Sequence, residues 1–261
     1  MSGEEAGDGV PVVLLHGLTA TRRYVLQGSN QLPRRGHRVF SYDARGHGES
    51  SRAPDRTAYE YADLVSDLRH VLDELSLDRP VLVGSSMGAA TAMALALQEP
   101  DRVSALVQIT PAFDGTGRRD PAALEQWDAL AGALADEDID AFLERSAINA
   151  LPERFRETVL LAVRQRLEAH RDLGAVSDAV RVVSRSRAFE GLEGLEGLDL
   201  PVLVVGSRDD TDPGHPLAVA EEYARRLPRA RLVVEQPGES PLAWRGSSLS
   251  KAIAEFLDSL D

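Results

Sequence analysis

Cysteine is absent from this 261-residue chain, which excludes disulfides, thiolate nucleophiles and cysteine-bound metals. No hydrophobic run approaches the roughly 20 residues that cross a bilayer, and residues 1–9 lack the basic and apolar segments of a secretory signal. Basic residues are outnumbered, because 42 acidic residues against 29 Lys and Arg give a net charge of −13. We therefore expect a cytoplasmic protein with neither a membrane nor a nucleic acid as partner. The sequence leaves open whether the chain forms a homo-oligomer.

Metal and nucleotide signatures are also missing. The six histidines are scattered without the spacing of metal ligands, so no metal site is expected. The glycine-rich turns carry neither Gly-Lys-Ser/Thr nor Gly-x-Gly-x-x-Gly. These absences predict a protein without a cofactor whose partner is a small-molecule substrate.

Short apolar runs alternate with amphipathic segments along most of the chain. The runs end in polar or glycine residues and are typical of strands buried on both faces of a parallel sheet. They cover residues 10–15, 38–43, 80–84, 103–110, 201–206 and 230–235. Helical periodicity lies between them, at residues 61–75, 218–227 and 249–260. This alternation predicts an α/β fold with a mainly parallel, doubly wound sheet of about six strands.

Residues 111–200 interrupt this alternation with helical patterns and no convincing strand. The patterns cover residues 121–134, 139–148, 152–173 and 176–183. A Glu-Gly-Leu echo at residues 190–198 follows and is typical of a linker. We interpret residues 111–200 as a helical cap inserted into a core made of residues 1–110 and 201–261.

The segment around Ser86 carries the clearest chemical signal. A buried run at residues 81–83 leads into Gly84-Ser85-Ser86-Met87-Gly88, and a helix of small apolar residues follows at once. A Gly-x-Ser-x-Gly turn between strand and helix is the context of a nucleophile elbow. Ser86 is therefore the predicted nucleophile, although a glycine-rich turn that carries serine by chance is the alternative.

Other polar motifs follow neighbouring strands, and ligands bind beside the carboxyl ends of strands in such sheets. His16-Gly17-Leu18-Thr19 follows the first strand, where the backbone N–H of Leu18 could join that of Met87 in an oxyanion hole. Residues 46–50 follow the second strand and favour a shaping loop. Residues 206–213 follow the fifth strand and offer three carboxylates.

Together these motifs resemble the α/β-hydrolase superfamily over nearly the whole chain. The resemblance rests on His16-Gly17, residues 42–48, the elbow, the helical insertion and a Gly-x-x-Asp-x-x-x-Pro stretch at residues 206–213. It implies a serine esterase-like branch with a cap, in which Ser86 is the nucleophile and Leu18 and Met87 supply the oxyanion hole. It also implies an acidic triad member at Asp209, for which the alternative is a charge at a helix start.

Two further expectations concern the role of Asp212 and the number of strands at the start of the chain. Asp212 directly precedes Pro213, which suits an N-cap at the start of the next helix. Few residues precede the first strand, so the two antiparallel strands of many relatives are expected to be missing.

The sequence departs from the family at the catalytic base. After the last strand the family usually carries Gly-His, whereas this chain has Gly238-Glu239 and no histidine beyond His215. A glutamate with a pKa of about 4.3 accepts a serine proton poorly at neutral pH. Three candidates remain: His215 on the acid loop, Glu239 with its pKa raised by a neighbouring carboxylate, and His170 in the cap.

For each histidine there is an alternative to catalysis. His215 could be an exposed residue of a first helical turn, and His170 an exposed helix residue. His16 is expected to support the oxyanion loop, and His37 and His70 to lie at the surface. The sequence predicts a serine hydrolase that cleaves a small ester, thioester or lactone through an acyl-enzyme on Ser86, with Asp209 and His215 beside it. The alternative is a catalytically impaired ligand-binding protein of the same fold.

Overall fold

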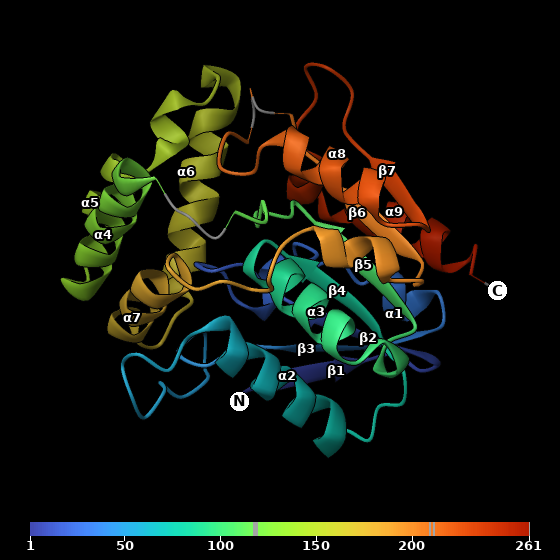
Figure 1. The fold of residues 1–261 in the computed structure, drawn as a ribbon. Coiled ribbons are helices and arrows are strands. Elements are labelled where there is room, and N and C mark those ends of the chain that lie inside the picture. The colour runs from blue at the N-terminus through green and yellow to red at the C-terminus, as the bar shows by residue number, and fades with distance from the viewer. Residues whose placement is uncertain (117–119, 209, 211, 261) are drawn as a thin grey trace.

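A seven-stranded sheet forms the centre of the computed structural model, which describes residues 1–116, 120–208, 210 and 212–260 (Figure 1). The strands are β1 (Gly3–Ala6), β2 (Val10–Leu15), β3 (His37–Tyr42), β4 (Val81–Ser85), β5 (Ala105–Ile109), β6 (Val202–Val205) and β7 (Ala230–Val233). They lie in the order β1-β3-β2-β4-β5-β6-β7, and every neighbouring pair is parallel except β1 with β3. The predicted α/β fold is confirmed, with one strand more than expected.

The additional strand is β1, at an edge of the sheet. Its sequence, Gly-Glu-Glu-Ala, is exposed throughout and has no apolar face. It therefore lacks the hydrophobic pattern from which a strand is predicted. Backbone pairing with β3 holds it, from Gly3 opposite Tyr42 to Ala6 opposite Val39. The expectation of a sheet without antiparallel strands is wrong by this one strand.

Helices cover both faces of the sheet, because alternate strand residues point to opposite sides. On one face, α2 (Tyr61–Glu74), α3 (Met87–Gln98) and α8 (Leu217–Arg226) pack on an apolar core that includes Val13 and Leu82. On the other face, α1 (Gln31–Arg34) and α9 (Gly246–Leu257) pack on a core that includes Val12 and Val83. Helix α3 is buried on nearly all sides, as expected for its small apolar residues. Short 3-10 helices are η1 (Arg22–Tyr24), η2 (Pro100–Arg102), η3 (Ala147–Ala150), η4 (Glu193–Gly197) and η5 (Leu242–Trp244).

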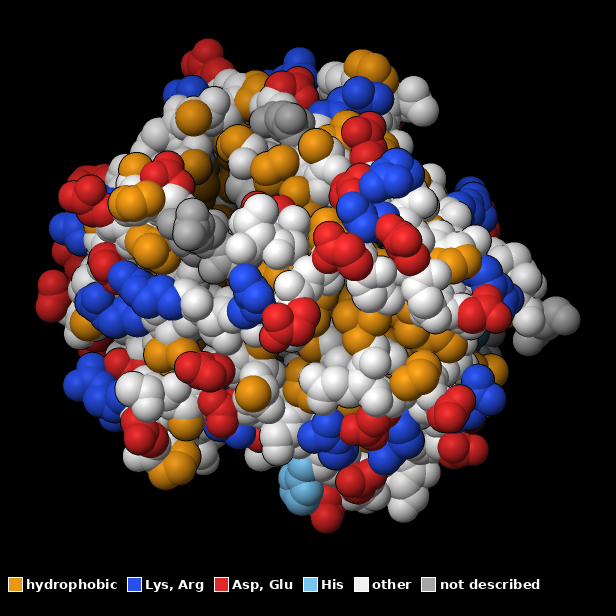
Figure 2. Space-filling model, in the orientation of Figure 1, with side chains coloured by type: hydrophobic (Ala, Val, Ile, Leu, Met, Phe, Trp, Pro, Cys, Tyr) orange, Lys and Arg blue, Asp and Glu red, His pale blue; other side chains and the backbone are white. Residues whose placement is uncertain are grey.

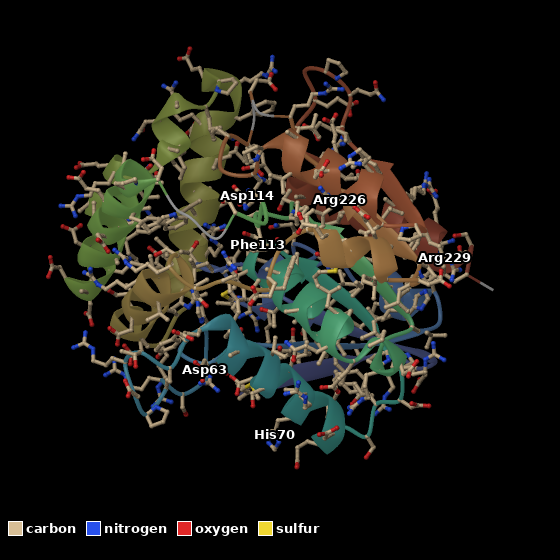
Figure 3. The ribbon with its side chains drawn as sticks, viewed as in Figure 1. Asp63, His70, Phe113, Asp114, Arg226 and Arg229 are labelled. Atoms are coloured by element: carbon tan, nitrogen blue, oxygen red, sulfur yellow. The ribbon has the colours of Figure 1, made fainter. Side chains whose placement is uncertain are left out.

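The described chain between β5 and β6 is helical. Its helices are α4 (Pro121–Ala135), α5 (Ile139–Arg145), α6 (Glu153–Glu168) and α7 (Leu173–Val183). They surround an apolar cluster of their own and stand to one side of the sheet in Figure 1. The ends of the insertion pack on the main core instead. The ring of Phe113, which is labelled in Figure 3, contacts that of Phe189, with ring centroids 4.5 Å apart. We refer to α4–α7 as the cap.

Strand register brings several loops to one edge of the sheet. Leu15 of β2 pairs with Gly84 of β4, and Ile109 of β5 pairs with both Ser85 and Val205. The segments that start at His16, Ser86 and Gly206 therefore leave the sheet at nearly the same level. This is the edge at which a parallel sheet places its ligand.

The face of the molecule in Figure 2 carries interspersed basic and acidic side chains around exposed hydrophobic ones. His70 projects from α2 and is exposed, as predicted (Figure 3). Within the described ranges, no helix is both long and apolar enough to span a bilayer.

Candidate active site

Ser86 occupies a strained turn between β4 and α3. Its backbone φ of +50° and ψ of −106° lie in a region that residues other than glycine rarely adopt. Two close backbone approaches enforce the turn. A Cβ on Gly84 would lie 2.3 Å from the carbonyl oxygen of Gly88, and a Cβ on Gly88 would lie 2.2 Å from that of Leu15. Both glycines of the pentapeptide are thus required by contact with neighbouring backbone.

The side chain of Ser86 lies against His215, and His215 lies against Asp212. Ser86 Oγ is 3.0 Å from His215 Nε2. His215 Nδ1 is 2.9 Å from Asp212 Oδ1 and 3.0 Å from Oδ2. A carboxylate at Nδ1 fixes the tautomer that carries its proton there, which leaves Nε2 free to accept the hydroxyl proton of Ser86. These three side chains form a hydrogen-bonded serine–histidine–carboxylate chain.

A single turn after β6 carries both the histidine and the carboxylate. The N–H of His215 donates to the carbonyl of Asp212 at 3.1 Å, so the residues at i and i+3 face each other. The expected N-cap role of Asp212 is wrong, because α8 begins only at Leu217, after Pro216. Pro213-Gly214 is a turn signal that could have predicted the pairing from sequence. Asp209, to which the family resemblance assigned the acid, lies outside the described residues.

Glu239 lies on the exposed loop after β7. Its Oε2 is 3.4 Å from Arg245 Nη2. Within the described part of the chain, no hydrogen bond or ion pair links Glu239 to Ser86 or His215. In the described structure Glu239 is therefore paired with Arg245 and not with Ser86.

The segment of residues 16–19, here called the oxyanion loop, runs beside Ser86. A Cβ on Gly17 would lie 3.6 Å from both Ser86 Cβ and the carbonyl oxygen of Ser85. Among the described residues, neither the N–H of Leu18 nor that of Met87 donates a hydrogen bond to an acceptor. Two such unengaged N–H groups near a nucleophile are what an oxyanion hole requires.

Three buried histidines pack together under this loop. His47 lies between the other two, with ring centroids 5.0 Å from His16 and 5.6 Å from His170. His16 supports the oxyanion loop as predicted, since its Nδ1 contacts the carbonyl of Gly17 at 2.8 Å. The expectation of an exposed His170 is wrong, because it is buried between cap and core. The expectation of a surface position for His37 is wrong as well, because its side chain is buried at the start of β3.

Burial lowers the pKa of all three rings. The pKa of His16 falls well below its ordinary value, that of His47 falls as well, and that of His170 falls to about 3. In each case, removal from water disfavours the charged ring most, and for His16 and His170 the neighbouring His47 adds to the effect. The three rings are therefore neutral at pH 7, and none of them contacts Ser86 in the described structure.

Arg166 of cap helix α6 also reaches this region. Its Nη2 donates to Thr19 Oγ1 at 2.9 Å. Burial lowers the pKa of this guanidinium, whereas the negative charge of Asp212 acts in the opposite direction. Nothing in the helical pattern of residues 152–173 distinguishes Arg166 from the other arginines of the same helix, so sequence reasoning missed it.

Metal-ligating side chains do not gather at the site. Over the described residues, no group of three or more His, Asp or Glu is placed to hold an ion.

Comparison with known proteins places the chain in a family. The family model for the alpha/beta hydrolase fold matches residues 10–245. A protein of Caulobacter sp. (strain K31), provisionally named carbamate hydrolase RutD, is 32% identical over 98% of this chain and 93% of its own length. A thermophilic esterase from Thermogutta terrifontis has a TM-score of 0.80 at 26% identity, covering 99% of this chain and 93% of that one. An enol-lactonase from Burkholderia xenovorans LB400 shares the fold, with a TM-score of 0.80 at 22% identity over 98% of this chain and 96% of its own. The protein thus belongs to the α/β-hydrolase fold family.

Proposed function

We propose that the protein is a serine hydrolase that cleaves small esters, thioesters or lactones through an acyl-enzyme on Ser86. The observation that carries the proposal is the 3.0 Å contact between Ser86 Oγ and His215 Nε2. The similarity to an esterase, an enol-lactonase and a provisional carbamate hydrolase supports acyl transfer at a carbonyl carbon.

The first half-reaction forms the acyl-enzyme. Ser86 Oγ attacks the substrate carbonyl while His215 Nε2 accepts its proton, and Asp212 stabilises the imidazolium at Nδ1. The N–H groups of Leu18 and Met87 stabilise the oxyanion, a contribution of roughly 3–4 kcal/mol for each donor. The tetrahedral intermediate then expels the alcohol, thiol or ring oxygen, which takes the proton from His215.

The second half-reaction restores the enzyme. Water replaces the leaving group and gives a proton to His215 Nε2 as its oxygen bonds to the acyl carbon. The second intermediate collapses to the free acid and returns the proton to Ser86 Oγ. In this mechanism the base is His215 on the loop after β6, where it is hydrogen-bonded to Asp212. Glu239 takes no part, and it pairs with Arg245 instead.

The alternative is a protein of the same fold that binds a ligand without turnover, which the missing histidine after the last strand would favour. His215 supplies a ring nitrogen at hydrogen-bond distance from Ser86, and this contact favours hydrolysis over binding alone.

Hydrolysis of p-nitrophenyl acetate and of a small lactone tests the proposal. We expect Ser86→Ala and His215→Gln each to reduce kcat by at least about 10⁴-fold, because each removes a member of one unit. Glu239→Gln is the matched control and should retain kcat within about twofold. Full activity in His215→Gln together with loss in Glu239→Gln would reject the assignment of the base.

A further inference from the structure

We propose that His47 and the cap residue His170 are positioning residues that hold the oxyanion loop in the conformation needed for acyl transfer. The inference rests on the proposed function, because it assigns the Leu18 N–H to the oxyanion hole. With His16 the two residues form a histidine column, defined by the three stacked rings described above.

The column meets three consecutive carbonyl groups of the loop. His16 Nδ1 lies 2.8 Å from the Gly17 oxygen, His47 Nε2 lies 2.5 Å from the Leu18 oxygen, and His170 Nε2 lies 3.4 Å from the Thr19 oxygen. One ring is thus assigned to each carbonyl. A loop contacted in this way at three successive residues has little freedom to rotate its peptide groups.

Backbone donors fix the tautomers of the outer two rings. The N–H of Ala44 donates to His16 Nε2 at 2.9 Å, so the proton of that neutral ring is on Nδ1 and is donated to Gly17. The N–H of Gly48 donates to His170 Nδ1 at 2.9 Å, so its proton is on Nε2 and faces Thr19. His47 Nδ1 and Nε2 both face carbonyls, and we assign its proton to Nε2, which makes the shorter of the two contacts.

The peptide group between Gly17 and Leu18 is where the column bears on catalysis. Its carbonyl accepts from both His16 Nδ1 and the N–H of Ala20, at 2.8 and 3.0 Å. The N–H of the same peptide group, that of Leu18, lies in the same plane and points in the direction opposite to the carbonyl. Holding the carbonyl therefore aims the N–H, and a donor at the carbonyl polarises that N–H toward an oxyanion.

His170 brings the cap into this arrangement. It lies between α6 and α7, and its Nδ1 accepts a hydrogen bond from the N–H of Gly48. The next residue, Arg171, donates its own N–H to the Gly48 carbonyl at 2.9 Å, so this segment is hydrogen-bonded to Gly48 in both directions. Arg166 of the same cap contacts the loop side chain of Thr19. The cap thus contacts the oxyanion loop directly, through His170 and Arg166, and any movement of the cap away from the core withdraws both contacts.

Substitution of His170 tests the role of the column. His170→Phe keeps a ring and removes both hydrogen bonds, whereas His170→Gln keeps a side-chain donor. We expect kcat for p-nitrophenyl acetate to fall about tenfold in the Phe variant, less than the 10²–10³-fold loss of a whole oxyanion donor. KM should change by less than about twofold, and the Gln variant should recover part of the loss.

Arg56→Ala is the control for cap attachment. It breaks the ion pair of Arg56 with Asp178 of α7, another bond between core and cap, and leaves the column intact. Equal loss of kcat in Arg56→Ala and His170→Phe would overturn the proposal, as would a folded His170→Phe variant with kcat within twofold of the wild type. If His170→Phe does not fold, wild-type kcat and wild-type loop exchange in His170→Gln and His47→Phe would overturn it.

Amide hydrogen exchange separates this inference from the proposed function. We expect residues 16–20 to exchange faster in His170→Phe while peptides of β4 and α3 remain protected as in the wild type. This readout needs no turnover, so an inactive wild type would reject the proposed function while the exchange still decides the role of the column. Unchanged exchange of the loop would overturn the inference.

Discussion

Asp212 and His215 are three residues apart on one turn, so a single local structure supplies two of the three side chains in the serine–histidine–carboxylate chain. The sharp turn at Ser86 was predictable from sequence, because strand, Gly-x-Ser-x-Gly and helix are contiguous. His215 could be named as a candidate because it follows a strand at the right edge of the sheet. The partner of His215 could not, because family spacing favours Asp209 and only the turn at Pro213-Gly214 brings Asp212 round to the imidazole.

Replacing the carboxylate tests this assignment at the residue scale. Asp212→Asn keeps the shape but favours the wrong tautomer of His215, and we expect kcat to fall by about 10⁴-fold with the fold retained. Asp210→Asn changes an exposed carboxylate on the same loop and is the matched control. Asp209→Asn, measured alongside, shows which carboxylate carries the role. Wild-type kcat in Asp212→Asn with a large loss in Asp209→Asn would reject the assignment of Asp212.

At the scale of elements, strands were predictable where burial on both faces imposes continuous apolar runs, as in β2, whose bounds of Val10–Leu15 match the prediction. β1 was not predicted, because its exposed Gly-Glu-Glu-Ala sequence has no apolar pattern and is held by backbone pairing alone. The helix predicted over residues 152–173 ends early, and the helix predicted over residues 176–183 begins early. α6 ends at Glu168 and α7 starts at Leu173, after Asp172 caps it through a bond from the Ala175 N–H. His170 lies in this break, where its Nδ1 accepts from the N–H of Gly48.

The close contact of Gly88 with β2 gives a prediction about how tightly β2 and α3 pack together. Gly88→Ala places a methyl group 2.2 Å from the carbonyl oxygen of Leu15, which forces β2 and α3 apart. We expect the free energy of unfolding to fall by about 3 kcal/mol, as measured by urea denaturation. Gly132→Ala is the matched control, because a methyl group there meets nothing within 4 Å in helix α4 and should stabilise the protein by about 0.5–1 kcal/mol. A stable Gly88→Ala variant would contradict the packing of the elbow.

At the scale of the whole molecule, the cap and the core meet through groups that the sequence pattern does not mark. The histidines of the column come from three distant segments, and only the fold brings them together. Periodicity reports which face of an element is buried, but it carries no information on which buried polar groups find one another. That is why the architecture was predicted far more fully than the support of the oxyanion loop.

The buried histidines make stability depend on pH. The unfolded chain protonates His170 near pH 6.5, whereas the folded protein holds its pKa at about 3. The unfolded state therefore binds more protons between these values, so stability is full above pH 6.5 and is lost as the pH falls toward 3. The loss is about 1.4 kcal/mol per pH unit for each such group, and His16 and His47 act in the same direction.

Urea denaturation from pH 7 to pH 4 measures this dependence. His170→Gln removes one of the groups and should flatten the fall in unfolding free energy by about 1.4 kcal/mol per pH unit. His70→Gln changes an exposed residue of α2 and should follow the wild-type curve. An unchanged slope in His170→Gln would show that this ring does not resist protonation in the folded state.

The intact mass of the protein after incubation with a fluorophosphonate shows whether Ser86 is activated for attack. Its phosphorus mimics the tetrahedral intermediate, so it reacts with an activated serine beside a working oxyanion hole. We predict one adduct in the wild type and in Glu239→Gln, and none in Ser86→Ala or His215→Gln. An unmodified wild type, or an adduct that persists without Ser86, would contradict the assignment of Ser86 and His215 as the reacting pair.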